Sequence, residues 1–149
     1  AKAVGLPMLD LRYSDYPAGE APAAMAHLAE RLSAADAFVF VAGEYNRGMQ
    51  PGLKNLVDHY LKEFDRRPAA IASYSMGRFA GVNSHADWTV TLSAMGMAVM
   101  PERLSVGQIQ QTLDEQARPQ GEGGAALDRG FAGFADTLIW WAQAARAQR

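Results

Sequence analysis

The chain has 149 residues, of which 49% are hydrophobic and 20% are charged, and its formal net charge is -2. These values predict one globular domain with a substantial core, and the charge argues against a dedicated nucleic-acid or anionic-membrane binder. Cysteine is absent, which excludes disulfides, thiol catalysis and zinc thiolates and favours a cytoplasmic protein.

The first half of the chain predicts two helices on either side of a strand. Residues 21–36 carry apolar side chains at helical spacing, and the run AFVFV (residues 37–41) is typical of a parallel strand buried on both faces. Residues 51–65 have an apolar stripe at i, i+3, i+4 and i+7 with charges opposite, and a proline in the first turn. We therefore expect an amphipathic helix over the whole of 51–65.

The second half predicts two further strands and two helices. Short apolar runs at 69–75 and 97–101 indicate strands, and residues 82–96 between them indicate a helix that a glycine closes. The polar segment 102–124 is expected to be an excursion or arm. The last helix is expected from about 125 to 148.

Strands that alternate with helices predict an α/β protein with a parallel sheet. In open sheets of this kind, ligands bind beyond the carboxyl ends of the strands. Two loops, residues 42–55 and 73–81, follow predicted strands in that position.

The first loop, AGEYNRGMQPGLKN (residues 42–55), has the residue types that a flat ligand needs. Three glycines let the backbone approach closely, Tyr45 offers a ring, and Asn46 offers an amide donor and acceptor. The predicted helix beginning at Pro51 adds unpaired N–H groups. These features suit a planar heterocycle with carbonyl and imide edges, although a solvated loop with a helix cap explains the same residues.

The second loop, SYSMGRFAG (residues 73–81), approximates the G-x-S-x-G nucleophile elbow of α/β-hydrolases, with Ser75 as the nucleophile. A hydrolase of that kind needs a histidine after the serine and an intervening acid. The only downstream histidine is His85, ten residues later and inside a predicted helix, so a serine hydrolase is a remote alternative. The three histidines have no metal-ligand spacing, and no metal site is predicted.

Three stretches resemble those of one enzyme family: GEYNRGMQPGLKNLVDHY (43–60), SYSMGRFAGV (73–82) and LSAMGMAVMP (92–101). They are similar to the corresponding stretches of the NADPH-dependent FMN reductases, flavodoxin-like enzymes that include chromate, quinone and azo-dye reductases. The resemblance covers residues 5–101. Its most specific part is the long spacing from EYN to PG-x-KN.

The resemblance implies an oxidoreductase with FMN as cofactor and NADPH or NADH as electron donor. Electrons would pass to a quinone, an azo compound, a metal oxyanion or a free flavin as the small-molecule partner. No side-chain acid or base is required, so no catalytic residue is predicted. The residues expected to position the flavin are Gly43, Glu44, Tyr45 and Asn46 in the first loop and Ser75, Met76, Gly77 and Arg78 in the second.

The expected fold is a single flavodoxin-like flavin-binding domain over residues 1–149, an open parallel sheet with helices on both faces. Compared with the family, the N-terminal β-α-β portion with its phosphate loop is missing, so we expect residues before Ala1 in the natural product. Without that portion, the strand at 37–41 should lack a neighbour. The family's proline before Glu44 is Gly43 here, which predicts a looser loop.

Two further expectations concern function. The non-enzymatic alternative is a truncated flavodoxin-like domain that binds flavin weakly or not at all and acts through oligomer contacts. The resemblance also implies a homodimer or homotetramer. Its candidate contact surfaces are the helix at 56–64 and the C-terminal helix, which carries Trp140 and Trp141.

Overall fold

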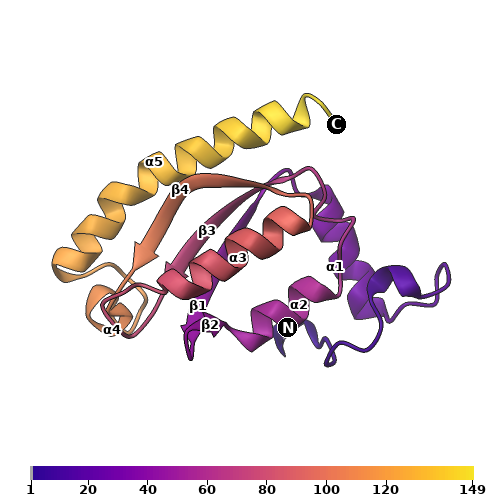
Figure 1. Cartoon of the computed structure of the whole chain (residues 1–149), viewed down its shortest axis with the longest axis horizontal. Coiled ribbons are helices and arrows are strands. Elements are labelled where there is room, and N and C mark those ends of the chain that lie inside the picture. The colour runs from indigo at the N-terminus through magenta and orange to yellow at the C-terminus, as the bar shows by residue number, and fades with distance from the viewer. Residues whose placement is uncertain (1) are drawn as a thin grey trace.

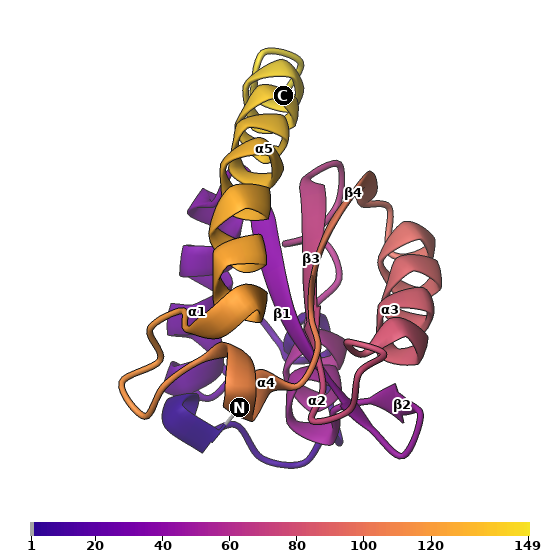
Figure 2. The same cartoon turned by 90° about the vertical axis from the view of Figure 1, so that its left-hand side faces the viewer.

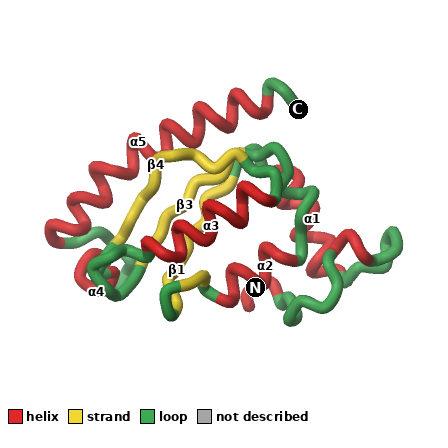
Figure 3. Tube along the Cα trace, in the orientation of Figure 1, coloured by secondary structure: helices red, strands yellow, loops and turns green. Residues whose placement is uncertain are grey.

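The computed structural model describes residues 2–149 and contains a four-stranded sheet in the order β2-β1-β3-β4 (Figure 1). Strands β1 (Phe38–Tyr45), β3 (Pro68–Tyr74) and β4 (Ala98–Val106) run parallel. The short β2 (Gly48–Met49) pairs antiparallel with the end of β1. Figure 3 shows the three parallel strands side by side, with helices on either side of them.

The helices cover both faces of the sheet, as the predicted flavodoxin-like α/β fold requires. Figure 2 shows α3 and α5 on opposite sides of the strands. The helices are α1 (Ala23–Ala34), α2 (Pro51–Asp58), α3 (Val82–Ala94), the short α4 (Ile109–Thr112) and α5 (Gly121–Arg146), with 3-10 turns at Lys2–Val4 and Tyr13–Asp15. Among residues 2–149, no helix has both the length and the apolarity to cross a membrane.

The larger core is built on aromatic rings between the sheet and the helices α2 and α3. The Phe40 ring on β1 stacks on the Trp88 ring of α3 at a centroid distance of 5.8 Å. The Phe64 ring lies 6.0 Å from Phe40 and meets Phe38 edge-on at 5.0 Å. Offset and edge-on pairs of this kind add to the hydrophobic gain from burying the rings.

A smaller core lies under α5 on the other face. Ala70 of β3, Met100 of β4 and Phe134 of α5 are buried together there, and Leu104 and Leu138 pack against them. Because β3 has buried side chains in both cores, it is the central strand of the molecule.

The prediction that residues 37–41 are buried on both faces is wrong. Val39 and Val41 are 48% and 58% exposed, whereas Phe40 between them is buried. Successive side chains of a strand point to opposite faces, and α5 contacts β3 and β4 on the face of the valines. On its outer edge β1 pairs only at Glu44 and Tyr45, so within residues 2–149 most of β1 has no strand neighbour on that side.

Helix α2 ends at Asp58, seven residues before the predicted end at 65. The chain then leaves the helix and buries Tyr60 and Phe64, while Leu61, which the helical period places on the apolar stripe, is exposed. The Tyr60 hydroxyl donates to the Met25 carbonyl oxygen at 3.1 Å, a contact that binds this turn to α1. Tertiary packing has overridden the local helical pattern here.

The expected arm at 102–124 is also wrong, because its first part belongs to the sheet. Strand β4 continues through Pro101 to Val106. Its register with β3 shifts between the pairs Ala69↔Val99 and Ile71↔Arg103, so Pro101 lies in an irregular stretch where a missing N–H is tolerated. The remainder holds α4 and the start of α5, four residues earlier than predicted.

We predict that Phe40→Ala lowers the free energy of unfolding by about 3–5 kcal/mol, because the ring is enclosed by aromatic neighbours. The matched control is Val41→Ala, one residue along on the exposed face, which should cost less than about 1 kcal/mol. Urea unfolding followed by circular dichroism measures both. Equal losses would contradict the one-sided burial of β1.

A second prediction concerns pH. Burial, with Glu63 and Tyr13 adding to it, raises the pKa of Tyr60 from 10.0 to about 12. The folded state thus favours the neutral phenol, so this stabilisation is fully present below pH 10 and is lost as the pH rises through about 12. The free energy of unfolding should fall more steeply over this range in the wild type than in Tyr60→Phe. Parallel curves would contradict the assignment.

Candidate functional site

The parallel register of the sheet brings three strand ends to one edge. Gly43 of β1 is paired with Tyr74 of β3, and Tyr74 is paired with Val106 of β4. The chain that follows each strand therefore begins at the same edge. Both loops singled out from the sequence are there, as the parallel sheet predicts.

The first loop is a tight hairpin, which we did not predict from the sequence. Tyr45 of β1 pairs with Gly48 of β2, and the two residues between them form the turn. Asn46 and Arg47 have φ angles of +47° and +65°, as in the hairpin turns whose twist matches that of the strands. The Tyr45 ring is 61% exposed at this turn. The signal for the hairpin was Asn46 followed two residues later by a glycine.

Gly43 does not loosen the loop, contrary to the expectation from the missing proline. It lies within β1 and is buried, and its N–H donates to the side-chain oxygen of Gln50. A β-carbon at this position would lie 2.8 Å from the Gln50 oxygen and from the end of the Tyr74 ring. The ends of the Gln50 and Tyr74 side chains therefore occupy the space that a β-carbon at position 43 would need.

The side chain of Glu44 turns toward α3. Its carboxylate oxygen accepts a hydrogen bond from the backbone N–H of Asn83 at 2.9 Å. The Glu44 side chain thus joins the first loop to α3, the helix that follows the second loop.

The second loop is exposed from Met76 to Phe79. The Ser75 hydroxyl donates to the Gly77 carbonyl oxygen at 2.9 Å, and the Arg78 guanidinium lies 4.8 Å from the centre of the Phe79 ring. Met76 is strongly exposed. A β-carbon at Gly77 would meet only the Ser75 oxygen, at 4.0 Å, so the backbone there is open to a ligand.

The segment after β4 supports the second loop, and sequence reasoning missed it. Ser75 N–H donates to the Val106 carbonyl at 3.1 Å, and Gln108 N–H donates to the Gly77 carbonyl at 3.0 Å. Gly107 packs so closely that an added β-carbon would lie 2.9 Å from the Arg78 carbonyl oxygen. The glycine directly after a strand was the available signal.

The LKN part of the first motif has a structural role. The Asn55 side chain accepts from Leu9 N–H at 2.9 Å and donates to the Pro7 carbonyl at 2.8 Å, which fixes the N-terminal segment against α2. Lys54 forms an ion pair with Asp58 one turn later. Pro51 is the first residue of α2, as predicted.

The geometry gives no support to a serine hydrolase. Among residues 2–149, no hydrogen bond joins Ser75 to a histidine, and the Ser75 hydroxyl is used within its own loop. His85 lies in α3 with its Nδ1 buried and without a hydrogen-bond partner in the described chain. Burial lowers the pKa of His85, and the charge of Arg103 lowers it further.

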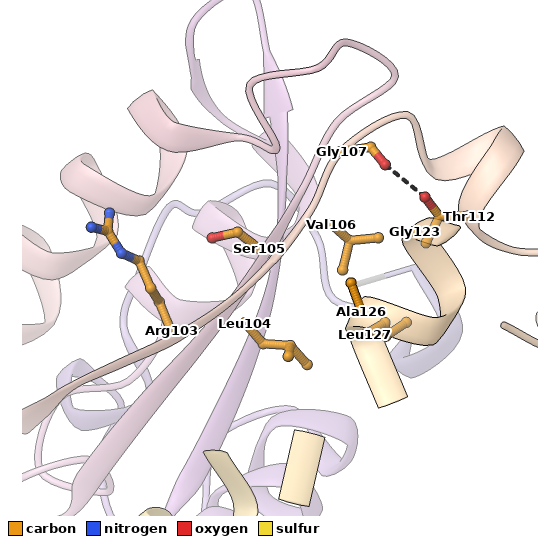
Figure 4. Close-up of a pocket in the computed structure, with 9 residues that line it drawn as sticks. All are labelled: Arg103, Leu104, Ser105, Val106, Gly107, Thr112, Gly123, Ala126 and Leu127. Atoms are coloured by element: carbon orange, nitrogen blue, oxygen red, sulfur yellow. Dashed lines mark hydrogen bonds between the residues drawn. The ribbon is translucent and has the colours of Figure 1, made fainter. Parts of the chain in front are cut away.

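A cavity of about 260 Å³ lies between β4 and the start of α5 (Figure 4). Leu104, Val106 and Leu127 line it, and the Thr112 hydroxyl at its rim donates to the Gly107 carbonyl at 2.8 Å. Figure 4 shows the Arg103 side chain pointing away from these residues. None of the site residues predicted from the sequence lines this cavity.

Comparison with known proteins identifies the family of the chain. The family model of the NADPH-dependent FMN reductases matches residues 2–111. The chain belongs to this family. This confirms the resemblance seen in the EYN and SYSMGRFAGV stretches.

Individual FMN reductases are similar over shorter ranges. The NAD(P)H-dependent FMN reductase PA1204 of Pseudomonas aeruginosa is 33% identical over 103 residues, which are 65% of this chain and 55% of that protein. The NAD(P)H-dependent FMN reductase ntnL of Nectria sp is 37% identical over 68 residues, which are 45% and 33% of the two chains. The chain thus spans about half or less of the length of these relatives.

A solved structure confirms the fold. FerB, a flavoenzyme NAD(P)H:(acceptor) oxidoreductase from Paracoccus denitrificans, superposes with a TM-score of 0.66 over 93% of this chain and 76% of that chain. The identity is 24%, so this likeness concerns the flavodoxin-like fold alone.

FMN is the cofactor that the family name implies, and its ring would need hydrogen-bond donors and an aromatic surface. Within residues 2–149, the backbone N–H groups of Met76, Gly77 and Arg78 donate to no protein acceptor. These three consecutive N–H groups, which we call the donor row, would suit the carbonyl and imide edge of a flavin. Tyr45 supplies an exposed aromatic surface at the neighbouring strand end.

We predict that Gly43→Ala lowers the free energy of unfolding by about 1–3 kcal/mol, because the new methyl group overpacks the contact with Tyr74 and Gln50. The loss should be smaller when Tyr74 is also alanine. Urea unfolding of the two single variants and the double variant measures the coupling. Additive losses would show that Tyr74 is not what excludes a side chain at Gly43.

Proposed function

We propose that the chain binds FMN at the two loops and acts as an NAD(P)H-dependent FMN oxidoreductase. The observation that carries this proposal is the meeting of the EYN loop and the SYSMGRFAGV loop at one edge of a parallel sheet. Family membership supports it. The bound flavin would supply the two-electron chemistry, with a hydride taken from NADPH or NADH and both electrons passed to an acceptor.

The protein's part in this reaction is positioning. Tyr45 would offer its exposed ring to the flavin, and the N–H groups of residues 76–78 would donate to the flavin's polar edge. Asn46 and Arg78 would contribute amide and guanidinium donors from the two loop tips, and Gly43 and Ser75 would shape the backbone on which they stand. Donors held in place before the reaction stabilise charge on the ring without reorganisation.

The acceptor we propose is a small flat or compact oxidant: a quinone, an azo compound, a metal oxyanion or free flavin. The support is the openness of the loops, where Tyr45, Met76 and Phe79 are all exposed. The cytoplasm is the proposed compartment, from the absence of cysteine.

We also propose a homo-oligomer with α5 in the contact. Trp140 and Trp141 lie edge-on at 5.1 Å on α5, and Ile139 beside them is exposed too. The other surface expected from the sequence, residues 56–64, is a poorer contact surface, because His59, Tyr60 and Phe64 are buried and the helix ends at Asp58.

A second candidate function is the flavodoxin-like domain with weak or no flavin binding. The observation in its favour is that, within the described residues 2–149, most of the outer edge of β1 has no strand partner, and the side chains of Val39 and Val41 are exposed. A domain in this state would act through protein contacts on that face.

The test is titration of the purified protein with FMN, followed by flavin fluorescence, and then NADPH and NADH oxidation with each acceptor class. Tyr45→Ala should weaken FMN binding about tenfold through loss of ring contact, and Tyr45→Phe should not. Phe131→Ala removes an exposed ring on α5, outside both loops, and is the control. Wild-type protein that takes up no FMN would favour the second candidate.

A further inference from the structure

We propose that Glu44 is a positioning residue that caps α3 from β1 and thereby holds the two loops of the site at a fixed separation. The contacts stand on the structure alone. Their effect on a bound flavin rests on the proposed function above.

Helix α3 begins without a cap of its own. Its N-cap residue is Gly81, with a φ of +75° and no side chain to accept from the first turn. A β-carbon at Gly81 would lie 2.8 Å from the Tyr74 carbonyl oxygen, so a serine or aspartate cap does not fit. The first-turn N–H groups therefore need an acceptor from elsewhere in the chain.

Glu44 supplies that acceptor. One carboxylate oxygen accepts from Asn83 N–H at 2.9 Å and from Ser84 N–H at 3.4 Å, and the Asn83 side-chain amide lies 3.3 Å from both oxygens. Val82 and His85 N–H donate to backbone carbonyls, so the first turn is fully accounted for. A carboxylate at this end also interacts favourably with the helix dipole.

A second bond also runs from α3 to β1, but it starts from a side chain of the helix. The Ser84 hydroxyl, which is fully buried, donates to the Gly43 carbonyl oxygen at 3.1 Å. The first turn of α3 thus donates to both the Glu44 side chain and the Gly43 backbone at the end of β1, about forty residues away in sequence. We call the set Gly43, Glu44, Asn83 and Ser84 the latch.

The latch lies between the two loops and so determines how far apart they are. Tyr45 follows Glu44 directly, and the donors of residues 76–78 lie in the loop that ends at α3. A movement of α3 relative to β1 would change the distance between the exposed ring and the donor row. Small displacements of such groups weaken a preorganised site strongly.

The latch itself is tested on the protein without flavin. Glu44→Ala should accelerate amide hydrogen exchange at Asn83 and Ser84 at least about tenfold, because Glu44 is the one acceptor that residues 2–149 offer to these N–H groups. Exchange at Trp88, in the middle of α3, should stay unchanged. Glu44→Gln, which keeps one acceptor, should give an intermediate rate. Unchanged exchange at Asn83 and Ser84 in Glu44→Ala would overturn the latch.

Its role in the site is tested by FMN titration of the same variants. Glu44→Ala should raise the Kd for FMN about tenfold, with Glu44→Gln in between. The matched control is Glu102→Ala, which removes the same charge from an exposed position on β4. Asn83→Ala keeps the backbone donors and removes the amide, and it should give a smaller rise than Glu44→Ala.

The outcomes separate the latch from the proposed function. Faster exchange in Glu44→Ala together with an FMN affinity equal to that of Glu102→Ala would overturn the positioning role. Wild-type protein that binds no FMN would overturn the proposed function and the positioning role with it. The exchange rates in the flavin-free variants would still decide whether the latch exists.

Discussion

The parallel pairing of β1 with β3 is the constraint on which the rest of the structure depends. It is in register from Phe38 opposite Ala69 to Gly43 opposite Tyr74, so both strands end at the same level. The small side chains of Ala69, Ala70 and Ala72 in β3 leave room for large neighbours. Aromatic rings fill that room on one face, and α5 approaches on the other.

The same pairing explains why the two binding loops meet. The loops that follow β1 and β3 meet because the two strands run in the same direction and end at the same level. The segment after β4 then supports the second loop from its other side, through the bonds of Val106 and Gln108. The site is therefore a product of strand direction and register more than of any single side chain.

Much of this was predictable from the sequence, for physical reasons. The α/β class, the strand cores and the helices α1 and α3 follow from local apolar periodicity, which both propensity and packing support. The two loops followed from their position after strands and from their glycines. The family resemblance added the identity of the ligand they are expected to hold.

The parts that local patterns could not predict depend on contacts between distant segments. The apolar stripe of 51–65 continues past Asp58, yet the chain turns there to bury Phe64 against Phe38 and Phe40. Pro101 reads as a strand end, yet a register shift carries β4 through it. The sequence predicts Glu44 as a flavin-positioning residue, whereas the structure shows that its carboxylate accepts a hydrogen bond from Asn83, 39 residues away.

The capping of α3 by Glu44 also bears on how the chain reaches its native state. A local cap can form as soon as its helix does, but this one requires the closure of a loop of about forty residues. The start of α3 is therefore completed only once β1 and β3 have come together, late in folding rather than early. The contact also constrains which substitutions the chain tolerates. A side chain at Gly81 would disturb both the end of β3 and the start of α3, and loss of the Glu44 carboxylate would disturb both β1 and α3. We therefore expect positions 44 and 81 to evolve together.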